Sequence, residues 1–177
     1  MSRAAHLTTR FLTSLRPRTV ESAERAWVQR VLTPPELAVW ETLGPADRAE
    51  SGAVARRAAR ALGPDADPRW LAAALLHDAG KTGAGLGTGA RVAATVVAGV
   101  VGHGRVRRWP NRIGRYIAHD DAGAALLAAA GSRPEVAAWA GAHHRRERWP
   151  ATRIPAEICE ILAIADGESE SRHVRRR

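Results

Sequence analysis

The hydrophobic positions of the chain fall into blocks that open on proline or a capping residue and close on glycine, which is typical of α-helices. Thr33-Pro-Pro-Glu36 is predicted to be a capping box for a short helix that ends at Gly44, and Ser132-Arg-Pro-Glu135 has the same pattern. No segment shows sustained alternation of apolar and polar residues, so no strands are predicted. The predicted helices cover residues 33–43, 46–62, 69–78, 90–102, 111–116, 122–130, 133–143 and 155–166.

This pattern predicts an all-α fold, a single-domain bundle of about seven to nine helices. The length of 177 residues agrees with one domain of ordinary size. Residues 1–45 are predicted to form an N-terminal helical extension, residues 46–167 the domain itself, and residues 168–177 a charged, disordered tail. The glycine-rich stretch Thr82–Gly89 is predicted to be a loop, either one that closes over a substrate or a plain linker.

Composition adds small apolar residues and a strong positive charge to this picture. Hydrophobic residues make up 45% of the chain and are mostly alanine, leucine and valine, which suits packed helices better than a sheet. The net charge of +9 favours anionic partners such as nucleotides, phosphorylated metabolites or nucleic acid. Nearly all basic residues are arginine, and no patterned basic and aromatic surface accompanies them, so nucleic acid is possible but not favoured.

Cysteine usage and the lengths of the apolar runs favour a cytoplasmic location. Cys159 is the single cysteine and lies in an apolar run, so it is expected to be a small core residue. The first residues lack the apolar stretch and cleavage site of a signal peptide, and the longest apolar run, Val92–Val101, is too short to span a membrane. We therefore expect a soluble cytoplasmic protein with no membrane partner, whose oligomeric state the sequence does not indicate.

Candidate chemistry is concentrated in the segment Leu71–Lys81, where an apolar helix delivers an adjacent His77 and Asp78 at its C-terminal end. Burying an imidazole and a carboxylate beside a hydrophobic helix is costly without a charge partner. A divalent cation is such a partner, because imidazole nitrogen and carboxylate oxygen are suitable ligands. The alternative is an ordinary helix C-terminus that ends in a histidine.

Lys81 favours the functional interpretation of this segment. It is the only lysine in the chain, and it lies three residues after Asp78. Its point-charge ammonium suits phosphate and differs in function from the planar guanidinium of arginine. The sequence therefore indicates a phosphate-binding role for Lys81.

The segment His77-Asp-Ala-Gly-Lys81 and its surroundings resemble the HD-domain superfamily of metal-dependent phosphohydrolases, over about Asp47–Gly167. The resemblance implies an all-helical HD-type bundle in which a first histidine, an adjacent His-Asp pair and a late aspartate bind metal. His77 and Asp78 match the pair. Asp166, at the end of an apolar helix, matches the late aspartate.

Two further segments resemble the branch of this superfamily that carries extra histidines and a second metal, and that includes the HD-GYP proteins. One segment opens a helix at His119, and the other closes a helix at His143 and His144; the GYP signature itself is absent. The resemblance implies that these histidines are metal ligands, although only one of the adjacent pair need bind metal while the other faces phosphate. Arg145 is a candidate substrate contact, with a solvated helix end as the alternative.

Glu50 marks a departure from the resemblance. By its spacing from Asp47, it takes the position at which the superfamily has its first histidine. A glutamate can bind the same class of cation and would favour harder ions such as Mn²⁺ or Mg²⁺. Otherwise Glu50 faces solvent or pairs with an arginine, and the metal site is weakened.

The function implied by the resemblance is hydrolysis of a nucleotide or other phosphorylated small molecule by metal-activated water. One or two divalent ions per chain, Mn, Mg, Fe or Zn, are implied. Asp78 would bridge or orient the metals and Lys81 would neutralise charge on the phosphate. The first site would hold His77 and Asp166, and the second His119 with His143 or His144.

Three alternatives stay open from the sequence. The first is a non-catalytic module that binds a nucleotide or second messenger through a degenerate site, which Glu50 supports. The second is a di-iron oxygenase of the HD type, which the extra histidines permit. The third is a basic nucleic-acid adaptor, whose binding would weaken steeply with salt.

Overall fold

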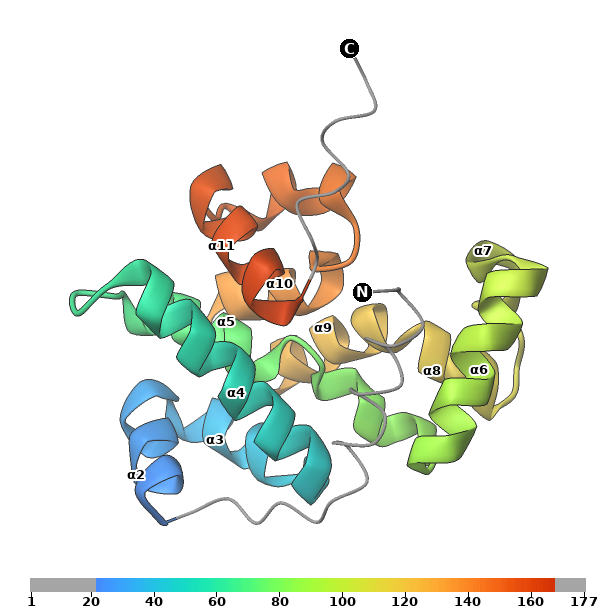
Figure 1. Ribbon diagram of the computed structural model, residues 1–177, viewed down its shortest axis with the longest axis horizontal. Coiled ribbons are helices and arrows are strands. Elements are labelled where there is room, and N and C mark those ends of the chain that lie inside the picture. The colour runs from blue at the N-terminus through green and yellow to red at the C-terminus, as the bar shows by residue number, and fades with distance from the viewer. Residues whose placement is uncertain (1–21, 168–177) are drawn as a thin grey trace, which may run out of the picture.

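The computed structural model describes residues 22–167, apart from the side chains of residues 83, 84 and 88, and this part of the chain is helical with no strand (Figure 1). The prediction of an all-α, single-domain fold is confirmed. In chain order the helices are α2 (Ser22–Val31), α3 (Pro34–Glu41), α4 (Pro45–Leu62), α5 (Pro68–Leu76), the 3-10 helix η1 (Ala79–Ala84), α6 (Thr88–Val101), α7 (His103–Val106), α8 (Arg112–Ile117), α9 (His119–Ala130), α10 (Pro134–Ala142), the 3-10 helix η2 (Arg146–Thr152) and α11 (Ala156–Asp166).

Most helices lie where the capping signals predict them, although α7 and η2 were not predicted. Two further differences concern predicted motifs. The predicted loop Thr82–Gly89 is mostly helical, because η1 continues to Ala84 and α6 already begins at Thr88. Ser132 does not cap α10: the N-cap position belongs to Arg133, and the Ser132 hydroxyl donates to Glu36 instead, at 3.0 Å. A long-range carboxylate has therefore replaced the local partner that the capping-box pattern predicts.

The N-terminal extension shares its core with the domain. Residues 1–21 and the predicted tail at 168–177 lie outside the described residues. In the described part of the extension, Val28 on α2 and Trp40 on α3 are buried in the same hydrophobic cluster as the domain helices. These two helices are therefore packed as part of the bundle.

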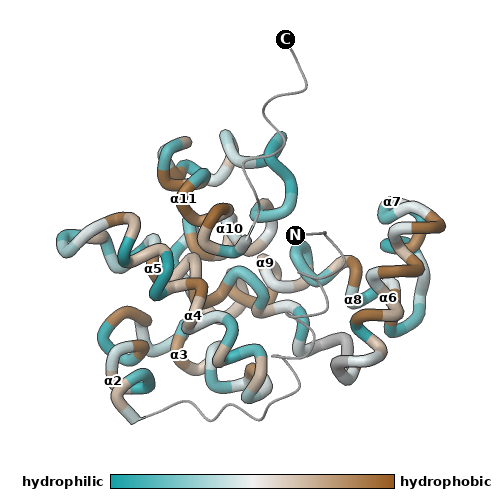
Figure 2. Tube along the Cα trace, in the orientation of Figure 1, coloured by the Kyte–Doolittle hydropathy of each residue, from teal (hydrophilic) through white to brown (hydrophobic). Residues whose placement is uncertain are grey.

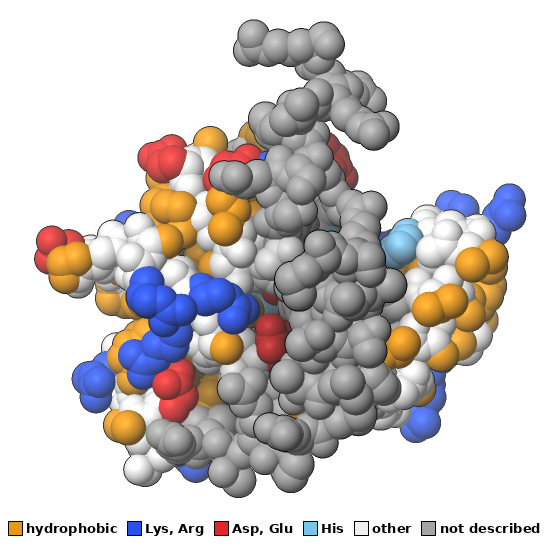
Figure 3. Space-filling view, viewed as in Figure 1, with side chains coloured by type: hydrophobic (Ala, Val, Ile, Leu, Met, Phe, Trp, Pro, Cys, Tyr) orange, Lys and Arg blue, Asp and Glu red, His pale blue; other side chains and the backbone are white. Residues whose placement is uncertain are grey.

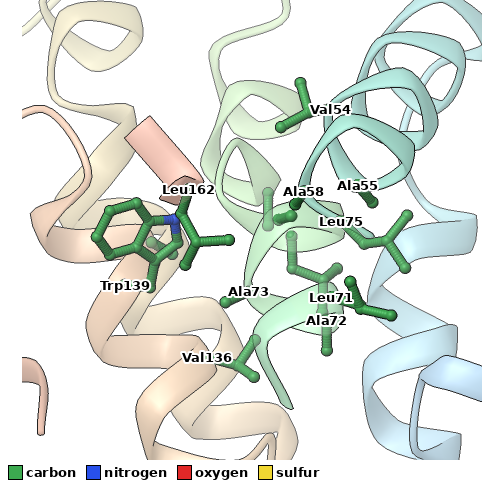
Figure 4. Close-up of a cluster of buried hydrophobic side chains, with 14 of the residues drawn as sticks. Val54, Ala55, Ala58, Leu71, Ala72, Ala73, Leu75, Val136, Trp139 and Leu162 are labelled. Carbon is green, nitrogen blue, oxygen red and sulfur yellow. The ribbon is translucent and has the colours of Figure 1, made fainter. Parts of the chain in front are cut away.

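The core is built around α5, whose residues from Leu71 to Leu76 are all buried. Figure 4 shows α5 between side chains of α4, such as Val54, and side chains of the C-terminal helices, such as Trp139 and Leu162. Three of the six buried positions of α5 are alanines, which let neighbouring helices approach closely. Because α5 is enclosed on all sides, the residues at its C-terminal end are held in fixed positions.

A buried ion pair ties α3 to the start of α10. Glu36 is fully buried, and the Arg133 guanidinium donates to its carboxylate, at 2.9 Å from Nε and 2.6 Å from Nη2. Burial alone would raise the pKa of Glu36, but the hydrogen bonds from Arg133 and from the backbone N–H of Thr33 outweigh it and lower this pKa to about 2. The carboxylate is therefore ionised and fully bonded inside the protein.

The helices α6, α7 and α8 form a lobe beside this core (Figure 1). A bidentate contact joins α6 to α4, because the Arg91 guanidinium donates to both carboxylate oxygens of Asp47. Figure 2 shows that hydrophobic residues continue along α6 as they do along the central helices. Within the described residues, none of the helices combines the length and the apolar character that crossing a membrane requires.

Candidate metal centre

The ends of four helical segments converge on one place and bring the predicted residues with them. His77 and Asp78 follow α5, His119 opens α9, His143 follows α10, and Asp166 closes α11. Imidazoles 77, 119 and 143 are buried, with at most 7% of each residue exposed. The sequence places these residues far apart, so packing of the bundle assembles the site.

Each buried histidine is fixed by the same backbone hydrogen bond. Its Nδ1 faces a carbonyl oxygen, which can only accept, so Nδ1 carries a proton and Nε2 is the nitrogen that can offer a lone pair to a metal ion. This backbone partner sets both the tautomer and the orientation of a metal-binding imidazole. The acceptors are the carbonyls three residues earlier in the chain: Ala74 for His77 at 2.9 Å, Tyr116 for His119 at 2.8 Å, and Ala140 for His143 at 2.9 Å.

The three Nε2 atoms point at the carboxylate of Asp78. Its Oδ2 lies 3.2 Å from Nε2 of His77, while its Oδ1 lies 3.1 Å from Nε2 of His119 and 3.7 Å from Nε2 of His143. Asp166 Oδ1 lies 3.3 Å from Nε2 of His77. The two oxygens of Asp78 therefore face two different sets of histidines, as a carboxylate between two cation positions would.

The carboxylates of Asp78 and Asp166 dominate the electrostatics of this centre. Burial lowers the pKa of His77, but the nearby carboxylates of Asp78 and Asp166 outweigh it, and the result is a pKa well above the usual range. Burial and the neighbouring His144 hold the pKa of His143 well below the usual range. Two carboxylates thus draw a proton onto His77 while His143 stays neutral, and a divalent ion would supply the same positive charge.

Lys81 supplies one further positive charge. Its ammonium forms an ion pair with Oδ2 of Asp78. Burial acts to lower the pKa of Lys81, but the Asp78 carboxylate outweighs it and the pKa is raised, so the amine is charged. Burial acts to raise the pKa of Asp78, but the positive charges of Lys81 and His77 outweigh burial and lower this pKa well below the usual range. The carboxyl group of Asp78 is therefore ionised.

The donor set fits a divalent metal ion. Within residues 22–167, four buried atoms of this centre have no hydrogen-bond partner, and such atoms are costly when left unsatisfied. They are Nε2 of His77, His119 and His143 and Oδ1 of Asp78. In the described part of the chain, ligand atoms within 4.8 Å of one another form two groups that share His143. The groups are His77, His143 and Asp166, and Asp78, His119, His143 and His144.

Two glycines allow the segment carrying Asp78 to reach α9. A Cβ atom on Gly80 would lie 1.9 Å from the carbonyl oxygen of His119 and 2.6 Å from the amide nitrogen of Gly123. A Cβ on Gly123 would in turn lie 2.9 Å from the amide nitrogen of Gly80. The backbones of η1 and α9 therefore touch without side chains between them, and this contact brings Asp78 to His119.

Glu50 is not brought into either group of candidate ligands. Its side chain is 49% exposed on α4, and its Oε1 lies 3.6 Å from Nη2 of Arg57. Arg57 in turn donates to the carbonyl oxygen of Ala165 at 2.6 Å, beside the end of α11. Of the outcomes foreseen for Glu50, the structure therefore shows pairing with an arginine at the surface.

Arg145 contacts carboxylates of the protein. Its guanidinium lies 2.9 Å from Oδ2 of the buried Asp120, contacts Asp121, and donates to the carbonyl oxygen of Gly141 at 2.7 Å. Arg107 binds the same two aspartates. The predicted substrate contact is thus part of an ion-pair network that links the start of α9 to the end of α10.

Sequence reasoning identified the side chains of the site but not the atoms that orient them. The carbonyls that orient the three histidines belong to two alanines and a tyrosine, and these residue types do not indicate such a role. Their positions could have indicated it, because each acceptor lies three residues before its histidine in or beside a helical turn. Gly80 lies within the segment His77–Lys81, but the sequence does not reveal that it contacts Gly123 through the backbone.

Comparison with protein families gives one match. Residues 49–170 match the family model described as HD domain, and these residues contain every candidate ligand described above. Neither the search of curated proteins nor the search of solved structures returned a match.

Proposed function

Because the chain belongs to the HD domain family, whose members are generally metal-dependent phosphohydrolases, we propose that it hydrolyses a nucleotide or another phosphorylated small molecule. One observation carries the proposal. The Nε2 atoms of three buried histidines converge on an ionised aspartate, and within the described part of the chain these atoms have no hydrogen-bond partner outside this centre. A divalent ion between these atoms would satisfy all of them at once.

A divalent ion held by this centre supplies a Lewis acid for the phosphoryl group and a nucleophile from water at neutral pH. Asp78 holds the two groups of ligands together, since one of its oxygens faces His77 and the other faces His119. With three imidazoles and Glu50 outside the set, the donors favour a transition metal such as Mn, Fe or Zn over Mg. One or two ions per chain fit the two groups that share His143.

Lys81 is assigned to the phosphate. Its charged ammonium lies beside Asp78, at the edge of the metal ligands, and it can move to a substrate oxygen when Asp78 binds metal. Its role is to neutralise charge that develops on the phosphate during hydrolysis. Arg145 is not included, because two aspartates and a carbonyl already engage its guanidinium.

The experiment is a phosphate-release screen with purified protein, a panel of nucleotides and phosphomonoesters, and added Mn²⁺ or Mg²⁺. We expect metal-dependent turnover, lowered about 100-fold or more in Lys81→Ala, as when one charge-stabilising group is lost. Lys81→Ala should keep its metal content, and Lys81→Arg, which keeps the charge, is the matched control. Loss of metal together with activity in Lys81→Ala would contradict the assignment to phosphate.

A non-catalytic binding module is the second candidate, and the position of Glu50 favours it. A site that lacks the family's first histidine could bind metal and nucleotide without turnover. Glu50→Ala should leave metal affinity unchanged, and Glu50→His should raise it if the position can reach the metal. A wild-type protein that binds metal but hydrolyses nothing in the screen would favour this second candidate over the first.

A further inference from the structure

The outer face of α6 is apolar where a surface helix is normally polar. Four of the six large hydrophobic residues exposed in the described part of the chain belong to this helix. Val92, Val96 and Val100 are 45%, 60% and 83% exposed, and they recur every four residues along one side. Ala94 and Ala98 form the buried side, and the helix's single charged residue, Arg91, points inward to Asp47. The fold therefore leaves a continuous apolar stripe in water.

The lobe that carries this stripe is also strongly basic. Residues 79–119 contain no aspartate or glutamate, whereas α6 to α8 and their connections carry six arginines. Arg91 and Arg107 pair with aspartates outside the lobe. The other four arginines are exposed, and none forms an ion pair with a described residue: Arg105, Arg108, Arg112 and Arg115.

The two features lie on one projecting unit. Figure 3 shows hydrophobic side chains gathered on the α6–α8 lobe, with Lys or Arg side chains at its ends. The apolar stripe lies on α6 and the exposed arginines lie on α7, α8 and their connections. Apolar side chains together with basic ones on one unit are the combination that binds the interface of an anionic bilayer. The valines would enter the boundary between headgroups and acyl chains, while the arginines would meet the lipid phosphates.

Charge and side-chain type favour an anionic bilayer over a second copy of the chain or nucleic acid as the partner of this lobe. A second copy of the chain would bring the same unpaired arginines to the contact, and like charges would oppose the pairing. Nucleic acid would use the arginines but would gain nothing from a stripe of exposed valines. We propose that the α6–α8 lobe docks the protein on anionic lipid membranes, with the α6 valine stripe as the inserted face.

The test is flotation of the full-length protein with vesicles of phosphatidylcholine containing 30% phosphatidylserine, against vesicles of phosphatidylcholine alone. We expect binding to the anionic vesicles, with little binding to the neutral ones and weakening as salt is raised. The double variant Val96→Gln with Val100→Gln should reduce binding at least tenfold without any change in net charge. Its matched control, Leu126→Gln with Ile164→Gln, changes two exposed apolar residues elsewhere and should bind like the wild type.

A second pair of variants isolates the charge. Arg105→Gln with Arg108→Gln should weaken binding and flatten its salt dependence, whereas Arg30→Gln with Arg60→Gln removes the same charge from other exposed positions and should have a smaller effect. Far-UV circular dichroism confirms that each variant is folded. The proposal is overturned if the wild type ignores anionic vesicles, or if the valine variant binds them normally. It is also overturned if sedimentation velocity shows that the wild type is a dimer and the valine variant is a monomer. A third contrary result is that the arginine variant loses binding to nucleic acid but not to vesicles, while the valine variant changes neither.

Discussion

Two apolar helices of this protein, α5 and α6, have opposite surroundings. Alanine, leucine, valine and glycine make up six of the nine residues of α5 and eleven of the fourteen residues of α6. Yet α5 buries every residue from Leu71 to Leu76, while α6 exposes its valine stripe. The difference is positional, since α5 lies between α4, α10 and α11, and α6 packs mainly on α7 and α8. Apolar composition alone therefore predicts a helix but not whether that helix is buried or exposed. Only the buried helix α5 holds the residues at its end in fixed positions.

Enclosure of α5 fixes the positions of the residues that form the candidate metal centre. The three buried imidazoles of the centre are each held by a backbone carbonyl, and the helices that carry these carbonyls pack against α5, η1 or one another. Among the described residues, the four exposed arginines of the lobe form no ion pair, in contrast to the fixed polar groups of the centre. The predictions below test this contrast, from the largest expected effect to the smallest.

The largest effect is expected at the buried ion pair of the core. Glu36→Gln leaves Arg133 without its charge partner in a buried setting, which should cost about 3–5 kcal/mol of unfolding free energy. Glu41→Gln, which breaks an exposed pair with Arg25, is the control and should cost about 1 kcal/mol or less. Urea unfolding of both variants measures the difference, and equal costs would contradict it.

The pH dependence of the same pair has a definite sign. The pKa of Glu36 is lowered in the folded protein from 4.5 to about 2, so the pair stabilises the fold fully above pH 4.5. This stabilisation should be lost as pH falls from 4.5 toward 2. The stability gap between wild type and Glu36→Gln should therefore narrow over that range, and a gap independent of pH would contradict the account.

The core and the lobe should next differ in their response to loss of an apolar side chain. Leu75→Ala leaves a cavity in the fully buried core and should cost about 2–5 kcal/mol. Val96→Ala removes an exposed side chain on α6 and should cost about 0.5 kcal/mol or less. The two variants can be compared by urea unfolding, and a large loss in Val96→Ala would show that α6 is packed in solution.

Glycine substitutions should change stability in opposite directions in the two regions. Gly80→Ala places a Cβ against the His119 backbone and should cost about 1–3 kcal/mol or more, with weakened metal binding, because η1 must move from α9. Gly99→Ala meets no atom within 4 Å on α6 and should stabilise the protein by about 0.5–1 kcal/mol. Thermal unfolding with and without metal measures both, and a tolerated Gly80→Ala would contradict the close contact.

Most of the fold could be predicted because the helices carry their boundaries in proline, glycine and capping residues. Asp67, for example, caps α5 by accepting from the amide of Arg69, as its position before Pro68 indicates. Ser132 shows the limit, since its hydroxyl binds Glu36 from a distant helix and no local pattern records that contact. Where a polar side chain bonds to a residue far away in the sequence, capping rules predict the helix but not the hydrogen bond that the side chain forms.

The candidate site could be predicted as a set of residue types but not as an arrangement. Resemblance identified His77, Asp78, His119, His143, His144 and Asp166, and the structure brings all six into the two groups of possible ligands. Glu50 and Arg145 were selected by the same reasoning, and the structure pairs both with charges of the protein itself. Spacing along a helix does not reveal whether a charged side chain turns toward the site or toward a nearer partner.

The most direct test of the central claim is the metal content of purified protein. Elemental analysis of the wild type should find a divalent transition metal at close to one or two ions per chain, reduced to background in His77→Ala and in Asp78→Ala. His103→Ala, which removes an exposed histidine of the lobe, is the matched control and should keep the wild-type content. Wild-type metal content in both His77→Ala and Asp78→Ala would contradict the claim that these two residues hold the metal.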